Sequence, residues 1–427
     1  MRHLAFAAAM LSALSAPAAA AAQVIAVSAD RLIDVAGGRV VQQPVVIVSD
    51  GRVTAAGPRA EVQIPAAARR IDLPGMTILP GLIDMHVHLD TDPSYGGYTG
   101  LQFNDRFWSV LAVPHAMKTL QAGFTTVRNL GSDAWNDVGL RQAIEEGKIQ
   151  GPRIVSAAYS FGSTGGHCDS TYFPPSMDEK NPFNADSNDD GRRSVRRLRK
   201  YGAQVIKICA TGGVFSRNTE PGAQQLTLEE MKAVVDEAHM QGLKVAAHAH
   251  GASGIRDAAL AGVDTIEHAS LIDDEGIRAV KAKGAWLSMD IYNTEYTQAE
   301  GKKNGVLEDN LRKDREIAET QRQGFKRALS AGAKMVFGTD AGVYPHGDNA
   351  RQFQWMVRYG MTPMQAIQSA TLHAAEALGS HGRDIGVLAA GKQADLIAVA
   401  GNPIDDVRLL ERVAFVMKGG TVVKESK

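Results

Sequence analysis

The sequence predicts an α/β fold, in which a (β/α)8 TIM barrel is joined to a small β-sandwich domain built from both chain ends. Three observations predict it. Short apolar or β-branched runs alternate with helical patterns through the middle of the chain, strand-like segments occur at both ends, and polar residues follow several of the central runs. We expect the small domain at residues 23–76 and 384–427, and the barrel at residues 77–383.

The first residues have the pattern of a secretory signal. Arg2 is followed by an apolar run from Leu4 to Leu14, then by Pro17 and an alanine-rich stretch that ends near Ala22. The run is too short to cross a bilayer comfortably. We therefore predict a cleavable signal peptide at residues 1–22, a periplasmic or secreted protein, and no membrane insertion of the mature form.

Charge and cysteine content limit the classes of partner and fold. The 46 basic and 47 acidic residues give a net charge of -1, which offers no electrostatic footprint for nucleic acid or an anionic membrane. A small-molecule or dipeptide-like substrate is the expected partner. The two cysteines, Cys168 and Cys209, exclude a disulfide scaffold. One bridge between them is conceivable, but we expect two free thiols.

The strand-like segments at the two ends resemble each other. From Val24 to Ile64, short alternating apolar segments are broken by glycines. Near the other end, Ala394–Val399 and Val413–Lys418 have the same character, and Gly419 and Gly420 form a hairpin turn. Pairing of the two ends into one small domain accounts for both.

Eight strands with intervening helices are predicted for the barrel. One helix is marked clearly, because Thr227 can cap it, Glu230 follows three residues later, and the helical pattern reaches Met240. The predicted strands are Thr77–Leu82, Thr125–Leu130, Ile154–Ala158, Val205–Cys209, Lys244–Ala247, Thr265–His268, Ala285–Met289 and Lys334–Gly338.

Histidines and an aspartate stand where predicted strands end, which is where such barrels carry their chemistry. His86 and His88 are two residues apart, so an extended strand would present both imidazoles to one metal ion. His268 ends another strand, and Asp340 ends the last. His248 and His250 both follow one strand, and their spacing leaves either as the ligand. A histidine bound by backbone and an aspartate capping a helix are the ordinary alternatives.

Lys207 lies in the apolar run Gln204–Cys209, whose neighbours imply burial. A buried ammonium without a partner is costly. A solvent-facing lysine on an alternating strand is the simpler interpretation. The functional one is that the neutral amine reacts with carbon dioxide to give a carbamate that bridges two cations.

In combination these segments resemble the amidohydrolase superfamily, in its subtype with two metals and a carboxylated lysine. The matching segments occur in the expected order and are Pro80–His88, Val205–Ile208, Ala247–Gly251, Ile266–His268, Gly338–Asp340 and Gly391–Leu396. Thr164–His167 and Ala210–Val214 resemble the branch with Xaa-Pro and cationic dipeptidases and ochratoxin-hydrolysing amidases.

The resemblance implies a ligand set for two divalent metal ions, with zinc expected. His86, His88 and Asp340 would bind one ion, His248 and His268 the other, and carboxylated Lys207 both; it also selects His248 over His250. A hydroxide bridging the metals would attack an amide carbonyl, with Asp340 as proton shuttle. Relatives of this kind also imply a homo-oligomer.

Substrate contacts are predicted on the loops around the same end of the barrel. The resemblance implies that His167 contacts the substrate or its oxyanion. Arg217 could hold a substrate carboxylate by two hydrogen bonds, although a surface arginine is an equally simple interpretation. Tyr292, Asn293 and His346 follow the seventh and eighth predicted strands and are further candidates.

The leading hypothesis is therefore hydrolysis of the amide of a dipeptide, an N-acyl amino acid or an ochratoxin-type compound. A cyclic-amide hydrolase or a deaminase on the same barrel is the alternative enzyme. A catalytically inactive binding module is a third alternative, but such a protein would be expected to have lost ligands, and all six positions are filled.

Overall fold

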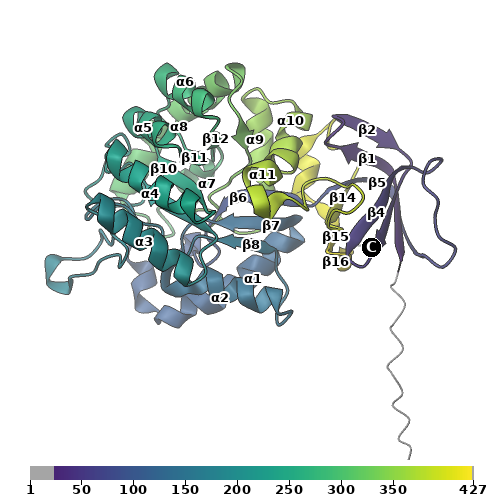
Figure 1. The fold of residues 1–427 in the computed structure, drawn as a ribbon, viewed down its shortest axis with the longest axis horizontal. Coiled ribbons are helices and arrows are strands. Elements are labelled where there is room, and N and C mark those ends of the chain that lie inside the picture. Colours follow the sequence, from purple (N-terminus) through teal and green to yellow (C-terminus); the bar gives the residue numbers. More distant parts are fainter. Residues whose placement is uncertain (1–23, 426–427) are drawn as a thin grey trace, which may run out of the picture.

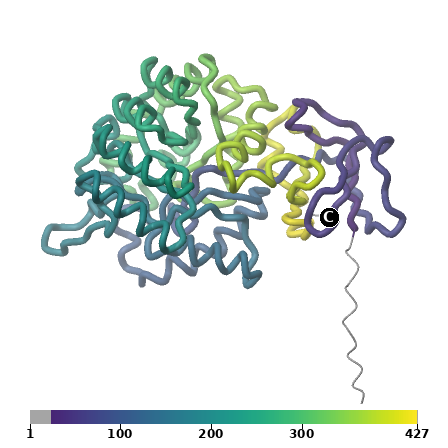
Figure 2. The backbone as a smooth tube through the Cα atoms, in the orientation of Figure 1, coloured from purple at the N-terminus to yellow at the C-terminus, as the bar shows by residue number. Residues whose placement is uncertain are grey.

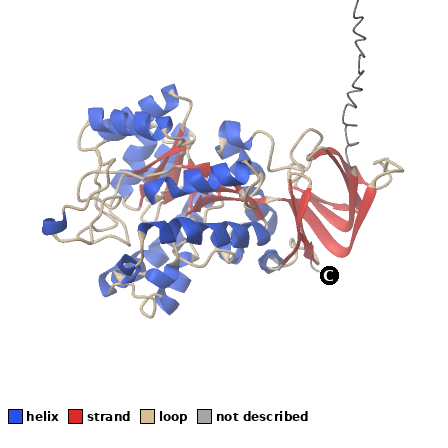
Figure 3. Ribbon diagram, turned by 90° about the horizontal axis from the view of Figure 1, so that it is seen from below, coloured by secondary structure: helices blue, strands red, loops and turns tan. Residues whose placement is uncertain are grey.

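A computed structural model describes residues 24–425, so the predicted signal peptide at residues 1–22 lies outside the described residues. A small sheet forms one end of the molecule, and a larger body of strands surrounded by helices forms the rest (Figures 1 and 3). The predicted α/β class is confirmed. Among the described residues, no helix is both long and apolar enough to cross a membrane.

The small sheet brings the two ends of the chain together, as Figure 2 shows in purple and yellow. Its strands run in the order β16-β15-β14-β5-β1-β3-β4, with β2 also paired to β1. The two ends meet where β5 pairs antiparallel with β14, in a register that sets Leu79 opposite Ile397. The bounds are β1 Ile25–Asp34, β2 Arg39–Gln42, β3 Pro44–Ser49, β4 Arg52–Pro58, β5 Arg69–Pro80, β14 Leu396–Ala400, β15 Val413–Lys418 and β16 Thr421–Glu425.

The larger body contains eight parallel strands in two hydrogen-bonded groups, β6-β7-β8 and β9 to β13. The groups meet on both sides. The amide of Cys209 donates to the carbonyl of Phe161 at 2.9 Å, and the amide of His88 donates to the carbonyl of Ala341 at 2.8 Å. The strands are β6 Leu82–Val87, β7 Phe124–Asn129, β8 Arg153–Ser156, β9 Val205–Cys209, β10 Lys244–Ala249, β11 Thr265–His268, β12 Trp286–Ser288 and β13 Met335–Val336.

The first of these strands differs from the prediction. Thr77–Pro80 ends β5 of the small sheet, and the parallel strand is Leu82–Val87, so the predicted strand Thr77–Leu82 is wrong. Gly81 alone separates the two strands, and a Cβ there would overlap the side chain of Thr125. His86 therefore lies within β6, and His88 lies just beyond its end.

Helices pack around the parallel strands (Figure 3). The predicted capping box of Thr227 and Glu230 is present, because each side chain accepts a hydrogen bond from the backbone of the other residue. The helices are α1 Asp105–Gln121, α2 Asn136–Glu145, α3 Asn188–Lys200, α4 Leu228–Met240, α5 Ala252–Ala261, α6 Asp274–Lys283, α7 Asn293–Glu300, α8 Glu308–Ser330, α9 Gln352–Arg358, α10 Pro363–Ser369 and α11 Leu372–Ala377.

Cys168 and Cys209 form a disulfide, so the expectation of two free thiols is wrong. The residues are 41 positions apart, but their Cα atoms lie 5.8 Å from each other. The loop between β8 and α3 returns over the end of β9, and this path could not be derived from the sequence. The bridge ties that loop to the strand that carries Lys207.

Candidate metal centre and active-site cavity

A cavity of about 240 Å³ contains most of the predicted site residues in its wall. It lies beyond the carboxyl ends of the parallel strands, where ligands are expected in such folds. Its lining includes His86, His88, His167, Lys207, His248, His250, His268, Asn293 and Asp340. Its size suits a small substrate rather than a folded protein.

His86, His88 and Asp340 form the first candidate ligand group. The Nε2 atoms of the two histidines are 3.3 Å apart, and Asp340 Oδ1 lies 3.4 Å from His86 Nε2 and 3.2 Å from His88 Nε2. Two imidazole nitrogens and a carboxylate oxygen thus converge on one point. This is a donor set that suits a divalent transition metal such as zinc.

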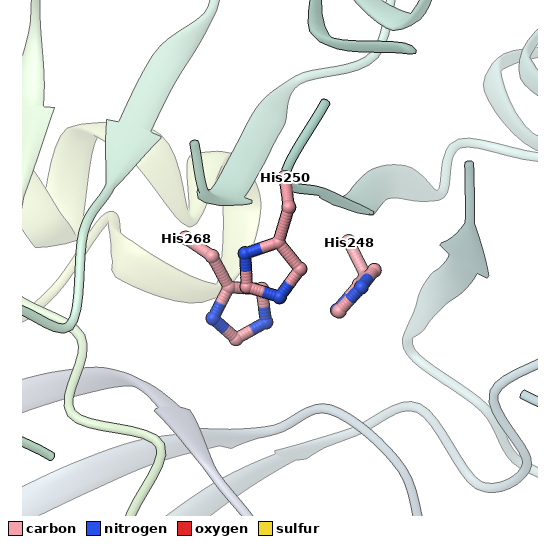
Figure 4. A group of neighbouring side chains, drawn as sticks. All are labelled: His248, His250 and His268. Atoms are coloured by element: carbon pink, nitrogen blue, oxygen red, sulfur yellow. The ribbon is translucent and has the colours of Figure 1, made fainter. Parts of the chain in front are cut away.

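His248, His250 and His268 form the second group, and all three are buried (Figure 4). The rings of His250 and His268 stack with centroids 4.8 Å apart, and the ring of His248 lies edge-on to both. His250 Nδ1 is 2.7 Å from the hydroxyl of Ser270, whereas His248 Nε2 is 3.1 Å from the carbonyl of Gly212. Both histidines belong to the cluster, so the choice of His248 still depends on the resemblance.

Lys207 lines the same cavity as the two groups. It is 3% exposed, which excludes the solvent-facing alternative, and its Nζ is 3.5 Å from His86 Nε2. Burial lowers the pKa of Lys207 to about 8, although the carboxylates of Glu267 and Asp340 oppose this change. At pH 7 about one in ten of these amines is therefore neutral and nucleophilic.

Glu267 and Arg128 are site-supporting residues that the sequence reasoning missed. Glu267 Oε2 lies 3.1 Å from His86 Nδ1, and its other carboxylate oxygen accepts a hydrogen bond from Arg128 at 2.8 Å. The acceptor at Nδ1 places the proton there and turns the unprotonated Nε2 of His86 toward Asp340. Arg128 follows two β-branched residues within an apolar strand, and the same pattern had identified Lys207.

Asp290 is a further residue that was missed. Its carboxylate lies 2.9 Å from His268 Nδ1 and also accepts a hydrogen bond from Gln321 at 3.2 Å. Burial lowers the pKa of His268, but the carboxylates of Asp290 and Asp340 together outweigh burial and raise it overall. Asp290 comes two residues after β12, so the rule that strand ends carry the chemistry would have found it.

His268 and Asp340 both have an unusual backbone conformation. Their φ angles are 68° and 59°, in the left-handed region that residues other than glycine rarely adopt, and such conformations concentrate at functional sites. In a regular strand, neighbouring side chains point to opposite faces. The left-handed backbone at His268 interrupts this alternation, so the side chains of Glu267 and His268 both reach the site. Burial raises the pKa of Asp340, but His86 and His88 outweigh it and hold that pKa well below its usual range.

His167 reaches the cavity from the loop between β8 and α3. Its ring stacks on His248 with centroids 4.2 Å apart, and its Nδ1 lies 2.9 Å from the hydroxyl of Ser216. Its backbone amide donates to the side chain of Gln225 at 2.9 Å. Burial, followed by the nearby His268 and Lys207, lowers the pKa of His167 to about 3, so the ring is neutral in this environment.

Of the other predicted substrate contacts, Asn293 lines the cavity, whereas Arg217, Tyr292 and His346 are absent from its lining. Asn293 lines the cavity and donates a hydrogen bond to Asp290. Arg217 is exposed, and its guanidinium donates to the hydroxyl of Tyr98 at 2.7 Å rather than lining the cavity.

Tyr292 and His346 are also absent from the residues that line the cavity. Tyr292 lines a separate hollow with Arg351. His346 stacks on His115 and contacts the carbonyl oxygens of His88 and Thr91, each at 3.1 Å. The chain turns after β12 and β13 direct these two rings away from the cavity, which strand positions alone could not predict.

The profile of the Amidohydrolase family matches residues 77–423. The chain belongs to the amidohydrolase family. This membership confirms the predicted superfamily, and it makes the protein a hydrolase that acts on amide-type carbon–nitrogen bonds.

Individual relatives agree with the predicted branch of the amidohydrolase family. Ochratoxinase of Aspergillus niger is 32% identical over 369 residues, which are 81% of this chain and 75% of that protein. A crystal structure of a Xaa-Pro dipeptidase with bound methionine in the active site is 36% identical and superposes with a TM-score of 0.87, covering 94% of this chain and 99% of that one. The crystal structure of A. niger ochratoxinase gives a TM-score of 0.84 at 30% identity, covering 95% and 96%.

Proposed function

We propose that this amidohydrolase cleaves the amide bond of dipeptides or N-acyl amino acids, with ochratoxin-type amides as a further substrate class, and that it uses two divalent metal ions. The observation that carries the proposal is the position of Lys207. It is a buried lysine 3.5 Å from His86, and the groups His86–His88–Asp340 and His248–His250–His268 lie on the same cavity. The Xaa-Pro dipeptidase and ochratoxinase relatives support the substrate class.

The donor set fits two ions. His86, His88 and Asp340 would hold one, His248 and His268 the other, and Lys207, once carboxylated, would contribute an oxygen to each. Nitrogen and oxygen donors of this kind favour zinc. When bound, the ions supply a water of lowered pKa and an electrophilic contact for the amide carbonyl.

The chain's own residues complete the chemistry. Asp340, held as a carboxylate by His86 and His88, would accept the proton of the attacking water and deliver it to the departing amine nitrogen. The neutral ring of His167 lies on the cavity wall, where its Nε2 can donate a hydrogen bond to the carbonyl oxygen of the substrate.

We take β6 to β13 as one (β/α)8 barrel and the terminal sheet as the small β-sandwich domain. Hydrogen bonds at both junctions between the two groups of parallel strands support the barrel. The mature protein is proposed to be periplasmic or secreted and to form a homo-oligomer.

The test combines metal content with a product assay. Protein reconstituted with zinc and bicarbonate should bind two ions per chain and release free amino acids from a panel of dipeptides, N-acyl amino acids and ochratoxin A. Asp340→Asn should lower kcat by roughly 100-fold or more, because it removes the proton acceptor. Release of ammonia, or ring opening without a free amine, would instead support the cyclic-amide hydrolase or deaminase alternative.

A further inference from the structure

Lys313 is a buried cation outside the metal centre. It lies on α8, its side chain is 0% exposed, and its Nζ donates to the carbonyl oxygens of Ser216, Gly213 and Thr219, the last two at 3.3 and 3.2 Å. The carboxylate of Asp309, one helical turn earlier, lies 3.5 Å from the same nitrogen. The three N–H donors of the ammonium group are thus directed at carbonyl oxygens of one loop.

That loop, residues 213–219, follows β9 and depends on the ammonium group for its shape. Three carbonyl oxygens converge on one point, where their dipoles would repel each other without a cation. Asn310, also on α8, donates to the carbonyl oxygens of Val214 and Ser216. The helix therefore holds this loop through two adjacent turns of polar contacts.

The loop in turn packs against the ring of His167. Ser216 contributes the hydroxyl that lies 2.9 Å from His167 Nδ1. Gly213 leaves the space that the ring occupies, because a Cβ at that position would overlap the imidazole. His248 stacks on the ring with centroids 4.2 Å apart. A small shift of the loop would therefore displace His167.

We propose that Lys313 is a positioning residue that fixes the ring of His167 in the cavity through the loop at residues 213–219. The effect on catalysis depends on the proposed function, in which His167 contacts the substrate, whereas the effect on the ring does not. The polar partners of Lys313 described above are three loop carbonyl oxygens and Asp309, none of which we assign to the metals, so its proposed role is separate from metal binding.

The test uses Lys313→Met, which removes the ammonium but keeps the length of the side chain. Lys326→Met, an exposed lysine on the same helix, is the matched control. Histidine side chains are labelled with 13C and 15N, and the His167 signal is assigned from its disappearance in His167→Gln. We expect the ring signals of His167 to shift or broaden in Lys313→Met and to stay unchanged in Lys326→Met.

A double-mutant cycle adds the catalytic readout. Lys313→Met should lower kcat/KM by roughly 10- to 100-fold in the wild-type background, because small displacements of a contact residue have effects of this size. In the His167→Ala background the same substitution should have little further effect. Lys313→Arg, which keeps the charge and several donors, should restore part of the activity.

Three outcomes separate the possibilities. Unchanged His167 signals in folded Lys313→Met would overturn the inference. So would a double variant whose loss of kcat/KM equals the product of the losses caused by Lys313→Met and His167→Ala alone. If His167 shifts but no amide is cleaved by the wild type, the inference stands and the proposed function fails. Should Lys313→Met not fold, Lys313→Gln, whose amide reaches fewer of the carbonyl oxygens, replaces it, and an unshifted His167 in that variant also overturns the inference.

Discussion

Replacing Cys168 and Cys209 together by alanine should destabilise the protein without rearranging its native fold. The bridge joins the loop between β8 and α3 to the end of β9. The loop keeps other anchors when the bridge is absent, since Asn181 donates to the carbonyl of Cys168 at 2.8 Å and Gln225 binds the amide of His167. The native circular dichroism spectrum should therefore be unchanged.

The size of the loss follows from the loop that the bridge closes. A sequence separation of 41 residues gives, by the chain-entropy relation, about 4 kcal/mol of stability at 25 °C. This corresponds to about a thousandfold change in the unfolding equilibrium constant. The effect arises mainly in the unfolded chain, which becomes freer when the cross-link is removed.

Urea unfolding, followed by tryptophan fluorescence and circular dichroism, measures the difference. Dithiothreitol should shift the wild-type midpoint to that of the double variant and leave the double variant itself unaffected. The reasoning is refuted if the oxidised wild type and the double variant unfold at the same urea concentration, or if denatured wild-type protein carries two free thiols before reduction.

Three further predictions concern the metal centre. Lys207→Ala should lose most of its bound metal by mass spectrometric analysis, with partial recovery in short carboxylic acids; full metal content without them would exclude the bridging role. With a pKa of about 8, the neutral fraction of Lys207 rises about 25-fold between pH 6.5 and 8.5. Because only the neutral amine attacks carbon dioxide, metal loading at constant dissolved CO2 should accelerate with pH, and a flat rate would contradict this. Glu267→Gln leaves Arg128 without its buried anion, so we expect a loss of about 3 kcal/mol in urea unfolding. Zinc affinity should also fall about 10-fold or more in competition with a chelator, and unchanged affinity would argue that Glu267 does not orient His86.

The succession of parallel strands could be predicted because their apolar runs are short and separated by helical patterns. The beginning of the series could not. Strand-like residues continue from Thr77 to Val87 and are interrupted only at Gly81. Nothing in this periodicity tells which part pairs with the small sheet and which part joins the larger body. That division depends on the register of β5 with β14, a contact between residues more than 300 positions apart.

The candidate ligands were predictable because their positions follow from strand ends, and strand ends follow from local patterns. Residues on loops were harder to place. The ring of His346 stacks on His115, and the guanidinium of Arg217 binds Tyr98. Both orientations depend on loop turns that no local sequence pattern predicts. The disulfide has the same origin, since it depends on where a long loop returns to β9. Arg128 and Glu267 were missed because each needs the other to make its burial tolerable, and this pairing is visible only in three dimensions.

The single residue between β5 and β6 has a consequence for anyone who shortens this chain. β5 is held on one side by β14 from the C-terminal segment, and it continues through Gly81 into the strand that carries His86. Trimming the last strands to obtain a minimal catalytic unit would remove the hydrogen-bond partner of β5. It would thereby loosen β5, which leads directly into β6, the strand that carries the candidate metal ligand His86. The terminal sheet therefore supports the candidate metal centre, and the metal affinity of a truncated form should be measured before its turnover.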